Sequence, residues 1–236
     1  MALYAMSDLH LSLGVEKPMD VFGNSWHNYM KKIKFQWNKT VGKDDTVIVG
    51  GDISWGMYLD EAKEDFAFLN SLPGKKILLR GNHDYWWESL SKLRAFLLKN
   101  SFDTIEFLQN DAMVVQEKVV CGTRGWILPQ SDGFTGKDRK IYERELIRLS
   151  LSLEKGKKIS EGREVICVFH FPPLKSDGSL DPSIGEILHK NSVKRCLYGH
   201  LHGQVAKSAF EGVSEGIEFR LVSADFLEFT PYNLDF

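Results

Sequence analysis

The stretch that decides the fold is KILLRGNHD, residues Lys76–Asp84. Lys76–Leu79 is a short apolar run typical of a buried strand, and the polar group Asn82-His83-Asp84 follows it almost directly. Four further places in the chain have the same order, a short apolar run and then histidine or acidic side chains. The polar residues of the five blocks are Asp8 and His10; Asp52; Asn82, His83 and Asp84; His170; and His200 and His202.

Each block follows a predicted strand at its carboxyl end. The strands before the other four blocks are Leu3–Met6, Thr46–Val49, Glu164–Phe169 and Lys194–Tyr198. Open α/β sheets bind ligands just outside the carboxyl ends of their strands, so one sheet could bring all these groups to one patch. Five of the seven histidines lie in the blocks. His27 and His189 lie on predicted helices, and we interpret them as structural or surface residues.

Each block alone has a simpler explanation. Aspartate is common in turns after strands, which would account for Asp8 and Asp52, and Asn82 and Asp84 could cap a helix. His170 could be a core histidine, but it stands at a strand end before a Phe-Pro-Pro run that cannot be helical. The alternating imidazoles of the last block are hard to explain as packing. The joint occurrence of all five blocks therefore favours a common site.

The segments between the blocks alternate between helical and strand patterns, and their spacing predicts an α/β fold. Gly122–Gly136 is rich in Gly, Ser, Thr and Pro and predicts a long structured loop. Glu117-Lys118 is the expected centre of a tight turn. We expect one domain over residues 1–236, built as a four-layer α/β/β/α sandwich. The predicted helices are Asn24–Thr40, Tyr58–Leu72, Tyr85–Lys99, Lys140–Leu153 and Asp181–Lys190; the further strands are Thr104–Leu108, Ala112–Gln116, Lys118–Cys121 and three antiparallel ones, Gln204–Phe210, Ile217–Ser223 and Leu227–Thr230.

Composition narrows the class of protein. The 236 residues are enough for one domain with a sizeable core. The net charge is −2, from 30 basic and 32 acidic residues that are interspersed, which argues against a long nucleic acid as partner. No apolar run approaches the roughly 20 residues of a membrane span, so no membrane association is expected. The sequence carries no signal for an oligomeric state.

The cysteines and the N-terminal segment bear on location. Cys121, Cys167 and Cys196 have no CxxC spacing, and two of them lie in apolar runs, so we expect reduced, buried thiols. Met1–Asp8 lacks the basic region of a signal peptide. Together these features predict a cytoplasmic protein.

The chemistry of the blocks predicts metal ions. Imidazole, carboxylate and amide ligands suit Mn, Fe, Zn, Co or Ni better than Cu(I). Seven candidate ligands exceed the four of a tetrahedral zinc site and fit two adjacent metals that share one carboxylate. Two metals about 3.5–4 Å apart can clamp an in-line displacement and lower the pKa of a bound water toward ~7.

The blocks resemble, in order, the motifs of the calcineurin-like metallophosphoesterase superfamily: Ser7-Asp8-Leu9-His10, Gly51-Asp52, Gly81-Asn82-His83-Asp84, His170 and Gly199-His200-Leu201-His202. The resemblance covers most of the chain. It implies two central mixed sheets flanked by helices. It also implies hydrolysis of a phosphate ester by a hydroxide that the metals hold, with no covalent enzyme intermediate.

The resemblance also implies a role for each residue. His83 would face the scissile phosphate and protonate the leaving oxygen, and Asp84 would orient His83. Asp52 would bridge the two metals. The ligands would be Asp8, His10 and His202 for the first metal and Asn82, His170 and His200 for the second.

Substrate contacts are open to two interpretations each. Trp55, Trp86-Trp87 and Trp126 could form a wall for an aromatic or sugar-bearing substrate, or they could pack in the core or at its rim. Arg124 in the long loop could bind phosphate, or it could belong to a solvated basic surface.

The predicted function is hydrolysis of a phosphomonoester or phosphodiester, with a small nucleotide-like substrate favoured. A Ser/Thr protein phosphatase would use the same metal core. A non-catalytic interaction scaffold of this fold would be expected to lack ligands or His83. A mononuclear hydrolase of another family would use fewer ligands than the chain offers.

Overall fold

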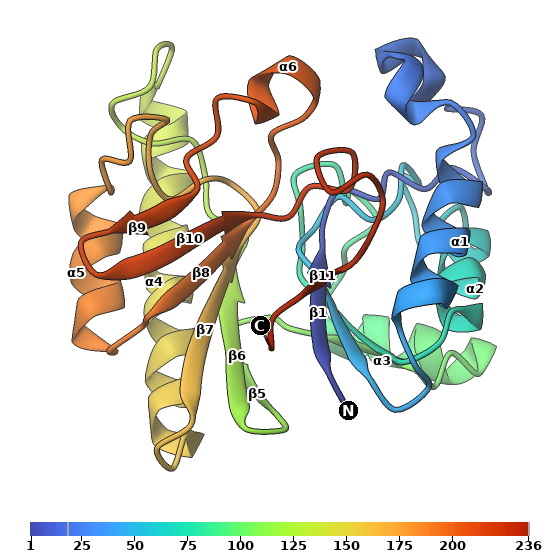
Figure 1. Cartoon of the computed structure of the whole chain (residues 1–236), viewed down its shortest axis with the longest axis horizontal. Coiled ribbons are helices and arrows are strands. Elements are labelled where there is room, and N and C mark those ends of the chain that lie inside the picture. Colours follow the sequence, from blue (N-terminus) through green and yellow to red (C-terminus); the bar gives the residue numbers. More distant parts are fainter. Residues whose placement is uncertain (18, 236) are drawn as a thin grey trace.

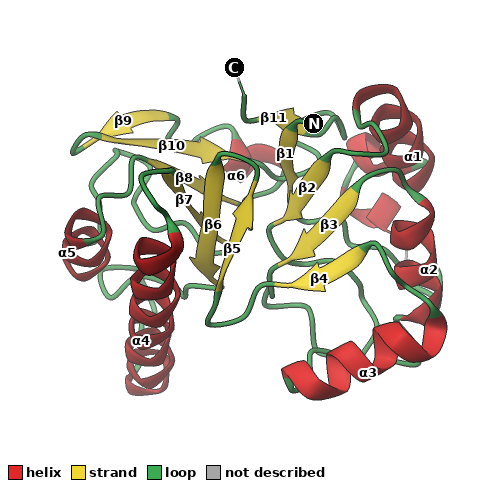
Figure 2. Ribbon diagram, turned by 90° about the horizontal axis from the view of Figure 1, so that it is seen from below, coloured by secondary structure: helices red, strands yellow, loops and turns green. Residues whose placement is uncertain are grey.

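The computed structural model describes residues 1–17 and 19–235. Two sheets pack face to face in the centre, and helices cover the outer face of each (Figures 1 and 2). This arrangement confirms the predicted α/β/β/α sandwich of four layers. No helix in the described part of the chain has the length and apolar character needed to cross a bilayer.

The first sheet has the order β11-β1-β2-β3-β4. Strands β1 to β4 run parallel to one another, and β11 pairs antiparallel with β1. Both faces of β1 and β2 are covered, which explains why these two strands are almost entirely apolar, whereas β4 at the edge of the sheet has the exposed Glu106. The bounds are β1 Leu3–Met6, β2 Thr46–Val49, β3 Lys75–Leu78, β4 Ile105–Phe107 and β11 Tyr232–Asn233.

The second sheet has the order β5-β6-β7-β8-β10-β9. Its four inner strands are parallel, and β5 and β9 are antiparallel strands at the two edges. Both sheets are therefore mixed, as expected. The bounds are β5 Ala112–Val115, β6 Lys118–Thr123, β7 Glu164–Phe169, β8 Arg195–Tyr198, β9 Gly212–Ser214 and β10 Ile217–Leu221.

Helices α1, α2 and α3 lie outside the first sheet, and α4 and α5 lie outside the second (Figure 1). Helix α4 begins with a capping box between Thr135 and Asp138, and α5 begins after Asp181, whose carboxylate accepts from the N–H groups of Ser183 and Ile184. The bounds are α1 Tyr29–Thr40, α2 Lys63–Ser71, α3 Leu90–Asn100, α4 Gly136–Ile159, α5 Pro182–Lys190 and α6 Gly203–Ala206, with short 3-10 helices η1 Met19–Phe22 and η2 Asn24–Trp26.

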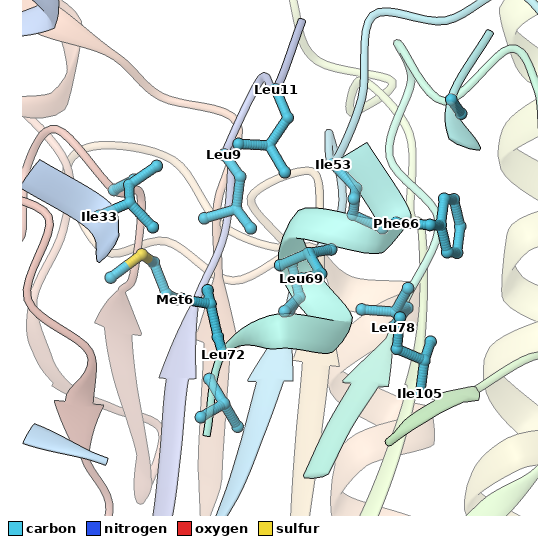
Figure 3. Close-up of a cluster of buried hydrophobic side chains, with 14 of the residues drawn as sticks. Met6, Leu9, Leu11, Ile33, Ile53, Phe66, Leu69, Leu72, Leu78 and Ile105 are labelled. Atoms are coloured by element: carbon cyan, nitrogen blue, oxygen red, sulfur yellow. The ribbon is translucent and has the colours of Figure 1, made fainter. Parts of the chain in front are cut away.

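Three hydrophobic layers hold the sandwich together. Along β1, Tyr4 and Met6 pack toward the helices, whereas Leu3 and Ala5 pack toward the second sheet. A strand points successive side chains to opposite faces, so a strand between two layers must be apolar throughout. Figure 3 shows part of the layer between the first sheet and its helices, in which Met6 of β1 and Leu69 of α2 belong to one buried cluster. The third layer lies between the second sheet and helices α4 and α5.

The five ligand-bearing strands belong to two sheets, so the expectation of one sheet was wrong. Strands β1, β2 and β3 lie in the first sheet, and β7 and β8 lie in the second. The blocks still converge, because the carboxyl ends of the two sets of parallel strands open toward the same edge of the sandwich.

Several predicted boundaries were wrong, two of them because the backbone turns left-handed there. The expected helix Asn24–Thr40 is broken at Asn28, whose φ is 55°, and the tight turn lies at Gln116-Glu117, where Gln116 has a φ of 55°. Helices α2 and α3 begin later than predicted, while β6 extends to Thr123, so the loop after it spans residues 124–135.

Two of the three expected C-terminal strands were wrong. Gln204–Phe210 contains the short helix α6 followed by a turn, and Leu227–Thr230 is a turn in which Glu228 and Phe229 have φ values of 50° and 60°. Strand β10 forms as predicted but runs parallel to β8. The three cysteines are buried and free, as expected.

Candidate metal centre

The loops that carry the five blocks have an uncommon backbone. Asp8, His10, Asp52 and His200 have φ values of 61°, 46°, 52° and 72°. Non-glycine residues avoid this left-handed region, and each one there costs about 1–2 kcal/mol. Four such residues within the blocks indicate that the surrounding contacts impose their conformation.

Asp84 supplies much of that constraint. Its buried carboxylate accepts four backbone N–H groups, from Asp52 at 2.9 Å, Ile53 at 2.8 Å, Ser54 at 3.3 Å and Gly81 at 2.7 Å. Asp84 thus ties the loop after β3 to the loop after β2. The expectation that Asp84 orients the ring of His83 is not met by these contacts, because the carboxylate is taken up by the backbone.

The first triad consists of Asp8, His10 and His202, whose ligand atoms all lie within 4.8 Å of one another. His202 Nε2 is 3.3 Å from Asp8 Oδ1 and 3.2 Å from His10 Nε2. Asp8 is held by Ser223 Oγ at 2.9 Å and by the backbone N–H of His200. Two imidazole nitrogens that face each other beside a carboxylate form a natural set of donors for one cation.

The second triad consists of Asp52, His170 and His200, with ligand atoms within 4.8 Å as well. His170 Nε2 is 3.3 Å from Asp52 Oδ2 and 2.7 Å from Asn82 Oδ1. The other ring nitrogen of His170 is 3.1 Å from the carbonyl oxygen of Gly50, which fixes the ring. Asn82 therefore lies where it can complete this set.

Asp52, a member of the second triad, also faces the first. Its Oδ2 is 3.3 Å from His170 Nε2, 3.8 Å from His10 Nε2 and 4.0 Å from His83 Nε2. Its Oδ1 accepts the backbone N–H of His83 at 2.8 Å. One oxygen is thus anchored by the backbone, and the other faces histidines of both sets.

The electrostatics of the centre favour cations. Burial alone would raise the pKa of Asp8, but the adjacent His202, His170 and His10 lower it below the usual range. Burial opposes protonation of His170 and His202, yet the carboxylates around them raise the pKa of these imidazoles to about 9 and about 10. A negative potential that holds protons on buried imidazoles also favours metal ions in their place.

The other two ligand histidines respond to burial. Desolvation lowers the pKa of His10 and of His200 to about 4, so both rings are neutral near pH 7. Neutral imidazole is the form that binds metals. Burial raises the pKa of Asp52 on its own, but His170 more than offsets this effect and lowers it to about 2. The donor set of both triads therefore fits metal ions.

His83 lies at the open side of the centre. About a third of its side chain is exposed, and its Nε2 lies 4.0 Å from Asp52 Oδ2. Burial lowers the pKa of its imidazole. Its ring packs against Trp55, with ring centroids 4.5 Å apart. His83 is the block histidine that belongs to neither triad.

Asp225 was missed by the sequence analysis. Its carboxylate lies 3.1 Å from His202 Nδ1 and accepts the N–H of Gly203 at 2.8 Å. It therefore holds the ring of His202 with Nε2 directed at Asp8. Asp225 follows the carboxyl end of β10 by four residues, so the same strand-end criterion would have found it.

The tryptophans divide between the centre and the core. Trp55 stacks on His10 at 4.8 Å, and Trp26, which was not predicted, packs edge-on against His10 and His202. Trp86 and Trp87 are buried in the layer beneath the helices, which favours the packing interpretation for both.

The side chain and backbone of Arg124 make contacts within the protein. Its guanidinium is 3.2 Å from Glu145 and lies over the ring of Trp126, and its carbonyl oxygen accepts the N–H groups of His170 and Phe171. The backbone of Arg124 therefore supports the His170 block. His189 lies at the end of α5 beside Glu215, and His27 lies in the break before α1 beside Asp20, as surface residues would.

Comparison with known proteins agrees with this geometry. The family model described as calcineurin-like phosphoesterase matches residues 1–204. A curated relative, the Gene 66 protein of Mycobacterium phage L5, is 34% identical over 80 residues, which are 33% of this chain and 37% of that protein. The match thus spans little more than a third of the relative's length.

Solved structures share the fold at low identity. A protein of unknown function from Aquifex aeolicus aligns with a TM-score of 0.52 and 18% identity, covering 98% of this chain and 95% of that one. Phosphopantetheinyl hydrolase from Mycobacterium tuberculosis aligns with a TM-score of 0.56 and 15% identity, covering 94% and 88%. At these identities the likeness concerns the architecture alone.

Proposed function

The chain belongs to the calcineurin-like phosphoesterase family, and from that premise we propose that its metal centre binds two metal ions and hydrolyses phosphate esters. The first triad, with Asp8, His10 and His202, would hold one ion. Asn82, His170 and His200 would hold the other, and Asp52 would be shared. Mn, Fe, Zn, Co and Ni all suit this donor set.

The position of Asp52 is the observation that carries the proposal. Its Oδ2 faces His10 Nε2 of one set at 3.8 Å and His170 Nε2 of the other at 3.3 Å. A site for one metal would not require a buried carboxylate oxygen that faces histidines of two separate donor sets. The centre draws on residues from Asp8 to Asp225, which supports one catalytic domain over the whole chain.

The ions would supply Lewis acidity toward the phosphoryl oxygens and lower the pKa of a bound water. The protein side chains supply the rest. Asp84, through the backbone of both loops, fixes the position of Asp52 and of the His83 N–H. His83 is the partly exposed imidazole of the centre, and its role would be to donate a proton to the leaving oxygen. Trp55 keeps the ring of His83 beside the centre.

Matched variants test these roles. Asp52→Asn is expected to lose bound metal and activity together, whereas His83→Ala is expected to keep the metal and lose turnover. Metal content by elemental analysis and hydrolysis of nitrophenyl phosphate and bis-nitrophenyl phosphate with added Mn are the measurements. Two metals per chain are expected at saturation. One metal at saturation, or loss of metal in His83→Ala with retention in Asp52→Asn, would contradict the assignment.

A substrate panel then separates the candidate reactions. Monoesters, diesters, nucleotides and a phosphoserine peptide would be compared under the same conditions. We favour a small ester over a long nucleic acid, because the chain carries a net charge of only −2, and the phosphoserine peptide tests the protein-phosphatase alternative. The presence of the complete ligand set and of His83 supports an enzyme rather than an interaction scaffold. Absence of turnover on every ester in the metal-loaded protein would favour the scaffold.

A further inference from the structure

We propose that an apolar cavity beside the metal centre binds the organic part of the substrate, so that the preferred phosphate esters carry a bulky uncharged apolar group. This inference rests on the proposed hydrolase function and specifies its substrate class. The cavity has a volume of about 320 Å³, at the lower end of the range for small-molecule sites.

The cavity is continuous with the metal centre. His10, His83 and His202 all line it; His10 and His202 belong to the first triad, and His83 Nε2 lies 4.0 Å from Asp52 Oδ2 of the second. An ester whose phosphoryl group lies between the triads would therefore direct its organic group into this space. His83 lies at the junction, where the leaving oxygen of such an ester would be.

The walls of the cavity offer little to a polar group. Apart from the three histidines, they are formed by the apolar side chains of Met19, Phe22, Trp26 and Trp55, together with Gly203 and the amide side chain of Gln204. The indole N–H of Trp55 is already used, because it donates to Met19 Sδ at 3.2 Å. A sugar hydroxyl or a charged group placed here would lose hydrogen bonds to water and gain few in return, whereas a hydrocarbon group would be favoured.

The mouth of the cavity has exposed apolar side chains. Phe22 is 62% exposed, and Val21 beside it is 76% exposed. Tyr85, which is 52% exposed, packs edge-on against the lining residue His83, with ring centroids 6.2 Å apart. The segment that contains η1 and η2 and the segment that contains α6 rise above the same edge of the sheets (Figure 1). Exposed apolar side chains around a cavity mark a binding surface.

One cation lies at this rim. Lys17 Nζ is 3.5 Å from the ring centroid of Trp55, which lines the cavity. The site therefore pairs a positive potential, suited to a phosphate, with an apolar chamber. That combination fits an amphiphilic ester rather than a nucleotide, whose sugar is polar.

A homologous series of alkyl phosphates tests the inference in the metal-loaded full chain. Ethyl, butyl, hexyl and octyl phosphate have leaving alcohols of similar acidity, so differences in kcat/KM report the fit of the chain. Each buried methylene contributes about 0.8 kcal/mol, which is roughly a fourfold gain. We expect kcat/KM to rise at least tenfold from ethyl to hexyl phosphate and then to level off as the cavity fills.

Phe22→Ala is the wall variant, and Phe35→Ala is its matched control, because Phe35 on α1 is also exposed, at 67%, and does not line the cavity. The hexyl-to-ethyl ratio of kcat/KM should fall about tenfold in Phe22→Ala and stay constant in Phe35→Ala. Calorimetric binding of hexyl and ethyl phosphonate, which are not hydrolysed, should give the same ordering.

The outcomes separate this inference from the function on which it rests. No turnover of any ester would refute the hydrolase. Turnover with less than a twofold change along the alkyl series, or with nucleotides preferred over hexyl phosphate, would refute the apolar substrate while leaving the hydrolase intact.

Discussion

Replacing Asp225 with alanine tests how the centre holds His202. In the folded chain, the Asp225 carboxylate lies 3.1 Å from His202 Nδ1 and accepts the N–H of Gly203 at 2.8 Å. A histidine that offers Nε2 to a metal must carry its proton on Nδ1, and a carboxylate acceptor at Nδ1 selects that tautomer. Without Asp225 the ring of His202 loses both its tautomer and its orientation toward Asp8.

Removal of such a partner costs about 10- to 100-fold in metal affinity or activity. The lower half of that range is expected here, because Trp26 also packs against the ring of His202, with centroids 5.7 Å apart. Asp225→Asn keeps an oxygen acceptor at the same position and should lie between the wild type and Asp225→Ala. His202 does not belong to the second triad, so the metal held by the second triad should be retained.

The assay is a competition between the protein and a chelator of known affinity, read as metal bound per chain. Asp181→Ala is the matched control, because the carboxylate of Asp181, like that of Asp225, is buried and accepts backbone N–H groups, here at the start of α5. It should lose stability, about 1 kcal/mol for a helix cap, without any change in metal affinity. If Asp225→Ala bound each metal with the same affinity as the wild type, the proposal that Asp225 positions the ring of His202 would be refuted.

Three further predictions concern the scaffold. Glu145→Gln removes the charge that Arg124 pairs with at 3.2 Å, and urea unfolding should show a loss of about 2 kcal/mol; an unchanged midpoint would contradict this. Burial lowers the pKa of Lys76 to about 8, below its value of ~10.4 in unfolded chains, so the unfolded state binds more protons between these values and stability should rise with pH across that window. Lys76→Met should remove this rise, and an identical slope in both proteins would exclude Lys76 as its source. Phe66→Ala empties space beneath α2, where Phe66 packs edge-on against Trp86, and should cost about 3–5 kcal/mol in thermal or urea unfolding; a loss under 1 kcal/mol would mean that the layer collapses around the gap.

The strands that precede the ligand blocks were predictable, because a strand buried on both faces appears in the sequence as a short apolar run. Leu3–Met6, Thr46–Val49 and Glu164–Phe169 were predicted with the bounds that the structure has. Each is an apolar run cut off by a polar block, so the chemistry of the site itself marks the strand ends. The positions of the five blocks followed from the same signal.

The pairing of those strands was not predictable in the same way. A parallel strand looks alike in sequence whichever sheet contains it, since both faces are apolar in either case. Only long-range pairing places β3 beside β4 and β6 beside β7. The expectation of a single sheet failed for this reason, although convergence at one edge did not depend on it.

The error at Leu227–Thr230 comes from tertiary packing. Leu227–Thr230 has the composition of a strand, but Glu228 and Phe229 adopt left-handed φ values that no strand contains. The turn folds back so that Phe229 packs against Trp26, with ring centroids 5.5 Å apart. Tertiary packing, which is absent from a local pattern, decided the conformation here.

Asp84 shows most clearly what a motif omits. A carboxylate next to a candidate catalytic histidine invites a role in orienting it, yet all four hydrogen bonds to its carboxylate come from backbone N–H groups of the loops after β2 and β3. Asp52, whose N–H is one of these groups, has a left-handed φ of 52°. Strain of about 1–2 kcal/mol at such a position persists only where neighbouring contacts exceed it, and hydrogen bonds to a charged group contribute about 1.5–3 kcal/mol each. Asp84 therefore acts on the centre through the backbone: it keeps Asp52 in the strained conformation that points Oδ2 toward both triads.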